Sequence, residues 1–256
     1  MKYTSIYPAD YFDAKQVDES FKDEAELLSS NGHQILTFSV ENQKKWIVEN
    51  DLCIYRGWML SKEDYELLSE TILKSNGILL TSKEQYFASH YLPNWYKSLK
   101  DFTPETIVIE KEKISTIKAI AESSGWSDFF VKDYVKSLTT SEGSIAKSID
   151  ELCNIVNKID TMRSIEGGIC IRHVESFVEN TEVRFFVFKN NIYAPDNIEI
   201  PDIAFKVMER IDLPFFSIDI IKDKDGKSWL VEIGDGQVSS FKSPWSNDNI
   251  LSIFQD

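Results

Sequence analysis

The hydrophobic and polar positions of the first hundred residues alternate between short apolar runs and longer amphipathic stretches. Residues 61–70 begin with Ser61, carry Asp64 three positions later and continue with helical spacing, which predicts a capped helix. Alternation of strands and helices predicts an α/β unit with a parallel sheet. Residues 90–97 are aromatic and contain Pro93, so we expect them to connect this unit to the next. The predicted strands of the unit are residues 34–40, 52–60 and 77–81.

After about residue 105 the pattern changes to a mixture of helices and strands without regular alternation. The helix predicted at 148–158 begins with a capping box, Ser148 followed by Glu151. The other predicted helices are 113–124 and 201–210, and the predicted strands are 127–135, 168–178, 182–188 and 191–194, with a turn at Asn190–Asn191. We therefore expect two units, an α/β domain over residues 1–105 and an α+β domain over residues 106–256.

Residues 217–237 form two apolar strands around a polar turn at Asp225–Gly226, which predicts a β-hairpin. One face of the hairpin is apolar, and the other face carries Asp219 directly opposite Glu232. Two carboxylates facing each other repel, unless a shared cation such as Mg²⁺ binds both of them. The alternative is that they extend into solvent or pair with lysines. The predicted pairs are Lys224–Lys227, Ile221–Leu230, Ile220–Val231, Asp219–Glu232 and Ile218–Ile233.

Composition and charge narrow the classes of function. The chain has 256 residues, of which 42% are hydrophobic, and a formal net charge of −14. This charge disfavours nucleic acid as the main partner, since phosphate contacts need a basic face. The three cysteines have no paired spacing, which predicts a reducing, cytoplasmic environment. Because 18 apolar residues never occur in succession, we expect no membrane span.

Two lysines precede a small polar loop in a pattern typical of phosphate binding. Lys132 interrupts an apolar strand, which is costly unless its ammonium meets an anion. Lys136 lies on the same face of that strand, because even separations share a side. Residues 138–144 then offer hydroxyl and backbone donors. The alternative is an ordinary loop.

Three further charged side chains in apolar surroundings are candidates for ligand binding. Glu182 and Arg184 could contact the ribose and phosphates of a nucleotide, or they could form a structural ion pair. Arg56 could bind a substrate carboxylate or phosphate, or its charge could reach solvent while its stem is buried.

These features follow one another along the chain in a fixed order: a strand with lysine, a polar loop, a capped helix, a strand with glutamate, Glu-x-Arg and an acidic hairpin. Over roughly residues 106–241 this order resembles the ATP-grasp superfamily. The segments FVKDYVKS (130–137) and LVEIGDGQ (230–237) look like a clade of small ATP-grasp proteins marked by one arginine and two lysines. The resemblance implies two subdomains, about 106–174 and 175–256, that clamp ATP. The first unit is similar to the family's pre-ATP-grasp domain.

The resemblance also implies roles for individual residues. Many family members carry Asn two residues after the metal-binding glutamate, whereas this chain has Gly234, so Asp235 or Gln237 could complete the metal site. Catalytic roles fall to Lys132 and Arg184, and substrate binding to Arg56 and Arg172. The residues implied in ATP binding are Lys132 and Lys136 at the phosphates, Glu175 with the backbone of Phe177 and Val178 at the adenine, Glu182 at the ribose and Arg184 at the phosphates, with Asp219 and Glu232 as Mg²⁺ ligands.

The function implied is an ATP-dependent carboxylate–amine ligase that works through an acyl phosphate. Its substrates would be a small molecule or peptide bearing a carboxylate, such as an amino acid, together with an amine. Such a reaction needs no covalent nucleophile from the protein. The alternatives are a phosphotransferase that uses the same clamp, or a nucleotide-binding regulatory module without turnover.

Overall fold

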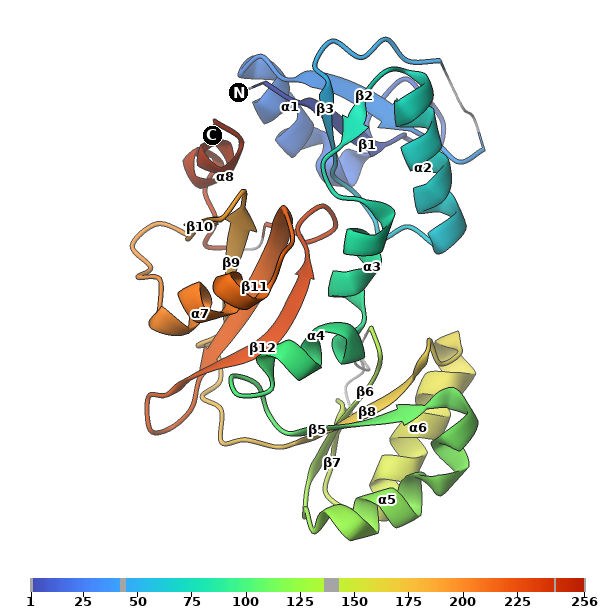
Figure 1. The fold of residues 1–256 in the computed structure, drawn as a ribbon, viewed down its shortest axis with the longest axis vertical. Helices are drawn as coiled ribbons and strands as arrows, with labels where there is room; N and C mark the ends of the chain where they lie inside the picture. The colour runs from blue at the N-terminus through green and yellow to red at the C-terminus, as the bar shows by residue number, and fades with distance from the viewer. Residues whose placement is uncertain (1, 42–44, 136–142, 242, 256) are drawn as a thin grey trace.

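The computed structural model describes residues 2–41, 45–135, 143–241 and 243–255. It contains three four-stranded sheets that follow one another along the long axis of the molecule (Figure 1). The sheet of the first unit lies at one end, an antiparallel sheet lies in the middle, and a second antiparallel sheet lies at the other end. The α/β unit followed by an α+β region, which the sequence pattern predicts, is confirmed.

The first unit has a parallel sheet with strand order β2-β1-β3-β4, as predicted. The predicted helix after Ser61 is confirmed, and the Ser61 hydroxyl accepts from Asp64 N. The predicted strand 52–60 ends already at Tyr55, because the chain turns at Arg56 into a segment that packs against the middle sheet. The elements are β1 (Thr4–Pro8), the 3₁₀ helix η1 (Glu19–Phe21), α1 (Lys22–Ser30), β2 (Gln34–Phe38), β3 (Leu52–Tyr55), α2 (Lys62–Lys74) and β4 (Ile78–Leu79).

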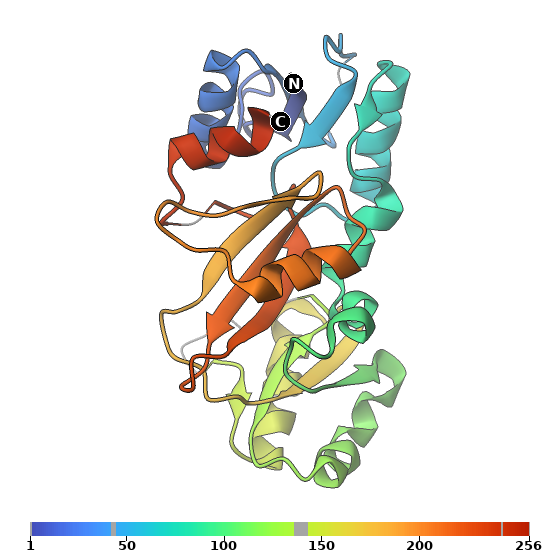
Figure 2. The ribbon, with the colours of Figure 1, turned by 60° about the vertical axis from the view of Figure 1, so that its left-hand side comes forward.

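Two helices replace the irregular connection predicted around residues 90–97. α3 (Lys83–His90) begins at Ser82, which forms a capping box with Gln85, and α4 (Leu92–Leu99) follows after one residue. Pro93 does not interrupt α4, because it occupies the first turn, where a helix needs no N–H donor. In Figures 1 and 2, α3 and α4 run along one side of the molecule from the first sheet toward the last.

The sheet at the far end has strand order β5-β8-β6-β7. α5 and α6 cover one of its faces, and their apolar side chains form a core with Val131 and Ile171 of the strands. The capping Ser148 hydroxyl accepts from Glu151 N, as predicted. The predicted strand 168–178 ends at His173. The elements are β5 (Thr106–Glu110), the 3₁₀ helix η2 (Lys111–Thr116), α5 (Ile117–Ser124), β6 (Phe129–Asp133), β7 (Ile145–Ala146), α6 (Ile149–Arg163) and β8 (Gly168–His173).

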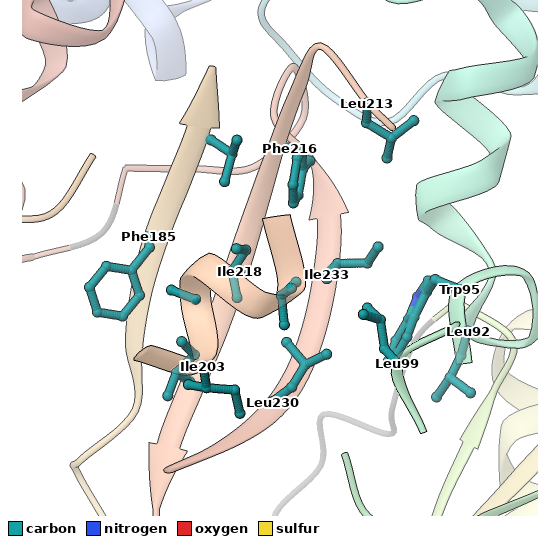
Figure 3. Packing of buried hydrophobic residues seen from close by; sticks show 14 of the residues in the cluster. Leu92, Trp95, Leu99, Phe185, Ile203, Leu213, Phe216, Ile218, Leu230 and Ile233 are labelled. Atoms are coloured by element: carbon teal, nitrogen blue, oxygen red, sulfur yellow. The ribbon is translucent and has the colours of Figure 1, made fainter. Parts of the chain in front are cut away.

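The middle sheet is antiparallel with strand order β10-β9-β11-β12. The turn before β10 is formed by Lys189 and Asn190, both with positive φ, one residue earlier than predicted. One face packs on α7 and α4 (Figure 3), with Ile218, Ile233 and Trp95 in the shared core. The elements are β9 (Val183–Phe188), β10 (Asn191–Tyr193), α7 (Asp202–Arg210), β11 (Phe215–Lys222), β12 (Ser228–Asp235) and α8 (Asn247–Gln255).

The opposite face of the middle sheet is divided into an aromatic half and a charged half. Phe186, Phe188 and Phe215 pack against β1, β3 and α8 in a core shared with the first unit. Side chains alternate in direction along a strand, so Arg184 of β9 and Asp219 of β11 lie on this same face, beyond the aromatic core. The remaining half of this face therefore borders the sheet of β5–β8.

The β11–β12 hairpin has the predicted pair Asp219–Glu232 but a different turn. The turn closes with an Asp223 N to Lys227 O hydrogen bond, so the predicted pairs Lys224–Lys227 and Ile221–Leu230 are wrong. Ile220 pairs with Leu230 instead of Val231, because this turn shifts the register by one residue. A β-bulge between Asp219 and Ile220 then restores the predicted pair Asp219–Glu232. Within the described part of the chain, every helix is too short or too polar to cross a membrane.

Candidate functional site

Three charged residues form a row across adjacent strands on the charged half of the middle sheet. Arg184 of β9 pairs in register with Asp219 of β11, and Asp219 pairs with Glu232 of β12. The guanidinium of Arg184 binds the Asp219 carboxylate in bidentate fashion, with Nε to Oδ1 at 2.7 Å and Nη2 to Oδ2 at 2.6 Å. Burial opposes the charge of Arg184, but the hydrogen bond and charge of Asp219 outweigh it and raise the pKa of Arg184.

Lys132 reaches the end of this row from the other sheet. It lies on β6, and its Nζ is 3.0 Å from Oε1 of Glu232. Its side chain is 4% exposed, whereas that of Glu232 is 40% exposed, so the ammonium lies deep and the carboxylate opens to solvent. Four charged side chains therefore line up between the two sheets, with two adjacent carboxylates, Asp219 and Glu232, between the cations Arg184 and Lys132. The carboxylate of Glu232 is thus the anion that makes a lysine inside an apolar strand tolerable.

A second buried cation, Arg172 of β8, lies beside Lys132. Its Nη1 donates to Val231 O at 3.0 Å and its Nη2 donates to Thr103 Oγ1 at 2.5 Å, while Nε is buried without a hydrogen-bond partner. Burial lowers the pKa of Arg172, and the charge of Glu232 offsets this only in part. Two buried cations, Lys132 and Arg172, thus lie near the carboxylate of Glu232 at the wall of the cleft.

Lys132, Arg172 and Glu232 line a cavity of about 460 Å³ between the two sheets. Its volume lies within the range of about 300–1,000 Å³ that is common for small-molecule sites. Six of its residues carry predicted roles in binding or catalysis, and eight others do not. The predicted residues are Lys132, Arg172, Glu175, Phe177, Glu182 and Glu232; the others are Pro104, Phe130, Ile145, His173, Val174, Glu179, Ile221 and Val231.

The segment between β8 and β9 carries the residues predicted to bind adenine. Oε1 of Glu175 forms a 2.9 Å hydrogen bond with Nδ1 of His173 at the cavity wall. Phe177 N donates to Glu175 O, and Val178 N donates to Lys222 O, both at 2.9 Å. Phe177 and Val178 are predicted to contact the adenine edge through their backbone, and the N–H groups of both are already bonded in this structure. Val178 does not line the cavity.

The charged row extends from this cavity, which Glu232 lines, to a smaller cavity, which Asp219 and Arg184 line. Glu182, predicted at the ribose, is exposed and lines both cavities. Arg184 and Asp219 line the second, of about 60 Å³, together with Ser243, Pro244 and Trp245, whose Nε1 donates to Arg184 O.

Arg56 lies outside both cavities and is only 2% exposed. Its guanidinium binds both carboxylate oxygens of Glu24 and donates to the carbonyls of Gly236 and Ser239. These contacts connect the first unit to the segment after β12. They give Arg56 a structural role, and its predicted part in substrate binding stays a prediction.

Two residues considered for the metal site are turned away from it. The side chains of Asp235 and Gln237 are buried at the first unit, where Gln237 donates to Tyr65 Oη and Asp235 Oδ1. They therefore do not complete a site with Glu232. Lys136 and most of the predicted phosphate loop lie outside the described residues.

Among the described residues, no three His, Cys, Asp or Glu side chains form a ready-made metal site. Asp219 and Glu232 alone offer two carboxylates, which fits a cation such as Mg²⁺ that takes its other ligands from water and phosphate. A larger cavity, of about 810 Å³, lies beside α1 and β2 of the first unit and contains none of the predicted site residues.

Sequence reasoning missed the apolar lining and the backbone contacts of the cleft. Phe130 and Val231 lie in apolar runs that pattern alone assigns to the core, and Ile145 lies in a short segment between polar residues. Sequence reasoning also missed Thr103, whose contacts with Arg172 and Leu230 O carry no local sequence signal. The distinguishing feature of the missed residues is their position between two sheets, which depends on the fold.

The sequence matches one family model over residues 88–253, described as an ATP-grasp domain of R2K clade family 3. A sequence comparison with curated proteins gives no match.

Solved structures with a similar fold include three that extend over nearly the whole chain. D-cycloserine synthetase DcsG has a TM-score of 0.66 at 12% identity, covering 99% of this chain and 97% of that one. The RimK domain ATP-grasp protein from Sphaerobacter thermophilus DSM 20745 has a TM-score of 0.65 at 12% identity, covering 99% and 100%. The ATP-grasp ligase PsnB, in complex with a minimal precursor, Mg and ADP, has a TM-score of 0.62 at 13% identity, covering 99% and 98%.

Proposed function

Because the chain belongs to the ATP-grasp family, in its R2K clade family 3, we propose that it is an ATP-dependent ligase that joins a carboxylate to an amine through an acyl phosphate. The observation that carries the proposal is the row Arg184–Asp219–Glu232, closed by Lys132 from the opposite sheet. Both signs of charge needed to bind a metal–triphosphate complex meet in this row, and its Glu232–Lys132 end lies at the wall of a cavity large enough for a ligand.

The two ion pairs suggest how this row would accommodate magnesium and nucleotide together. Without ligands, Lys132 neutralises Glu232 and Arg184 neutralises Asp219. When Mg²⁺–ATP binds, the carboxylates would exchange their side-chain partners for the metal, while the two cations would turn to phosphate oxygens. Each buried charge keeps an opposite charge throughout, which avoids the large cost of an unpaired buried ion. Mg²⁺ would supply neutralisation of the phosphate charge.

Each of these residues then has one proposed role in binding or catalysis. Lys132 and Arg184 bind the phosphates and stabilise the charge that develops during phosphoryl transfer. Asp219 and Glu232 hold the cation. Glu175 and Phe177 form the wall at the base-binding end, where Phe177 packs edge-on against Trp229. Arg172 adds positive charge at the wall of the cleft.

The proposed reaction has two steps. An oxygen of the substrate carboxylate attacks the γ-phosphorus of ATP, the bond to the β-phosphate oxygen breaks, and ADP leaves. The amine nitrogen then attacks the carbonyl carbon of the acyl phosphate, inorganic phosphate leaves, and the nitrogen loses a proton. Cleft walls that exclude water protect the acyl phosphate from hydrolysis.

An amino acid or a peptide is the proposed source of the carboxylate. PsnB was solved with a minimal precursor and with the precursor peptide PsnA2, so the shared fold is compatible with a peptide substrate. We also propose that the protein works in the cytoplasm, since Cys53, Cys153 and Cys170 are all free thiols.

A thermal-shift titration with ADP and Mg²⁺ tests nucleotide binding, and Glu232→Gln is the informative variant. A ligand at 100 times its dissociation constant stabilises a protein by about 2.7 kcal/mol. We expect a clear shift for the unaltered protein and a much smaller one for Glu232→Gln. Glu209→Gln, on α7 across the sheet from the cleft, is the matched control and should behave as wild type. No shift for the unaltered protein would refute the proposal.

Turnover is tested by ADP release with mixed amino acids and peptides as substrates. A ligase requires both a carboxylate and an amine for sustained ADP release. Release that needs only one acceptor, accompanied by a stable phosphorylated product, would identify a phosphotransferase. Nucleotide binding without release under any of these conditions would indicate a regulatory module.

A further inference from the structure

The backbone of β12 departs from the regular strand pattern next to Glu232, where Val231 is the extra residue of the bulge. In a regular strand, the carbonyls of neighbouring residues point to opposite sides. Here Leu230 O accepts from Thr103 Oγ1 at 2.8 Å, and Val231 O accepts from Arg172 Nη1 at 3.0 Å. Thr103 and Arg172 are also hydrogen-bonded to each other, so they lie on one side of the strand, and both carbonyls point to that side.

Thr103 and Arg172 form a buried clamp on the bulge. Thr103 lies between α4 and β5 and is 2% exposed, and Arg172 on β8 is 4% exposed. The Arg172 Nη2 donates to Thr103 Oγ1 at 2.5 Å. Leu230 N completes the contact by donating to Phe102 O at 2.8 Å. Three backbone groups of two consecutive residues of β12, Leu230 and Val231, are thus held from outside the middle sheet.

The bulge determines which side chains of β12 face the cleft. Leu230 and Ile233, three residues apart, both lie in the core beneath α7. The two residues between them, Val231 and Glu232, both line the cavity. Strict alternation would not allow this arrangement. Bulges of this kind re-aim side chains near functional sites, and the side chain re-aimed here is next to the Lys132 ammonium.

We propose that Thr103 and Arg172 are positioning residues that set the location of the Glu232 carboxylate, and through it the affinity of the cleft for a divalent cation. The inference rests on the proposed function, in which Glu232 is a metal ligand. Groups that orient a metal ligand without touching the metal change metal affinity by about 10–100-fold when they are removed. Thr103 acts at one remove, through the peptide groups of residues 230 and 231.

The test is Mn²⁺ binding to the full chain in the presence of ADP, measured from the electron paramagnetic resonance signal of free Mn²⁺. Mn²⁺ accepts the same oxygen ligands as Mg²⁺. Thr103→Val keeps the shape of the side chain and removes its hydroxyl, and we expect it to weaken Mn²⁺ binding about ten-fold. Thr103→Ser keeps the hydroxyl and should bind Mn²⁺ within about two-fold of wild type.

Thr106→Val is the matched control. Thr106 is also buried, and its hydroxyl donates to Pro104 O in the same connection, without contact to β12. Its loss should lower stability as Thr103→Val does and leave Mn²⁺ affinity unchanged. If Thr103→Val does not fold, Arg172→Lys takes its place, because lysine keeps the charge but cannot bind Val231 O and Thr103 at once.

A folded Thr103→Val or Arg172→Lys protein with wild-type Mn²⁺ affinity would overturn this inference alone. Equal weakening by Thr106→Val would also overturn it, since general destabilisation would then explain the loss. Absence of Mn²⁺ binding by the unaltered protein with ADP would instead refute the proposed function, and this inference with it.

Discussion

Replacing Arg56 with methionine is expected to destabilise the protein without changing its affinity for nucleotide. The Arg56 Nε and Nη2 donate to the Glu24 carboxylate at 2.7 and 2.9 Å. Nη1 donates to the carbonyls of Gly236 and Ser239 in the segment after β12. The guanidinium thus joins the first unit to the middle sheet, and it does so outside the cleft.

The size of the effect follows from what remains after the substitution. Breaking a buried ion pair by removing one partner costs about 3–5 kcal/mol, because the other charge stays buried. Glu24 is 14% exposed and would be left in this state. Methionine preserves much of the contact with Phe241, whose ring centre lies 4.5 Å from the guanidinium carbon. At about 2–4 °C per kcal/mol for a protein of this size, the melting temperature should fall by roughly 10 °C.

Urea unfolding followed by circular dichroism measures the loss, and the thermal shift with ADP and Mg²⁺ measures binding. Lys83→Met breaks the exposed pair Lys83–Glu66, for which the expected cost is below about 1 kcal/mol. The double variant Glu24→Gln, Arg56→Met should recover part of the loss, since it leaves no buried carboxylate unpaired. If Arg56→Met kept its stability and lost substrate-dependent ADP release, the structural role would be wrong and the predicted substrate-binding role would be supported.

Two further substitutions address the buried charges elsewhere. Burial raises the pKa of Asp235 to about 7, against opposing hydrogen bonds from Gln237, so the folded protein holds a proton that the unfolded chain releases near about pH 4. The stability from this proton is complete below about pH 4 and is lost as pH rises toward about 7. In urea unfolding, the free energy of unfolding of Asp235→Asn should therefore rise relative to that of wild type between pH 5 and 7. A difference between the two proteins that does not change with pH would contradict this. Lys132→Met should weaken Mg²⁺–ADP binding about ten-fold or more in isothermal titration calorimetry, as expected for a lost charge-assisted hydrogen bond. The control Lys118→Met, at an exposed position, should bind as wild type. Equal affinities of Lys132→Met and wild type would show that Lys132 does not bind phosphate.

The hairpin illustrates how far sequence reasoning reached in the middle sheet. The pair Asp219–Glu232 was predicted by folding the chain symmetrically about Asp225–Gly226 and is confirmed. The prediction succeeded because two deviations cancel. The real turn shifts the register by one residue near Lys222 and Ser228, and the bulge at Val231 shifts it back. Neither deviation has a sequence signal, since the clamp that holds the bulge comes from distant segments.

In other parts of the chain, the sequence pattern was sufficient to predict the elements that depend on neighbouring residues. The caps at Ser61 and Ser148 follow from side chains close in sequence, and the parallel first sheet follows from the alternation of strands and helices. The helical character of residues 92–99 was missed because Pro93 was taken as a break rather than as a first-turn residue. The partners of Lys132 and Arg56 depend on tertiary contacts and could not be assigned from pattern alone.

The aromatic core shared by the first unit and α8 has a consequence for synthesis on the ribosome. Tyr3 and Tyr7 belong to the same buried cluster as Ile253 and Phe254, near the other end of the chain. Translation proceeds at about 5–20 residues per second, so roughly 13–50 s separate the emergence of these partners. During that interval Tyr3 and Tyr7 lack the part of their apolar cover that α8 supplies. The core of the first unit is thus complete only after α8 has been synthesised.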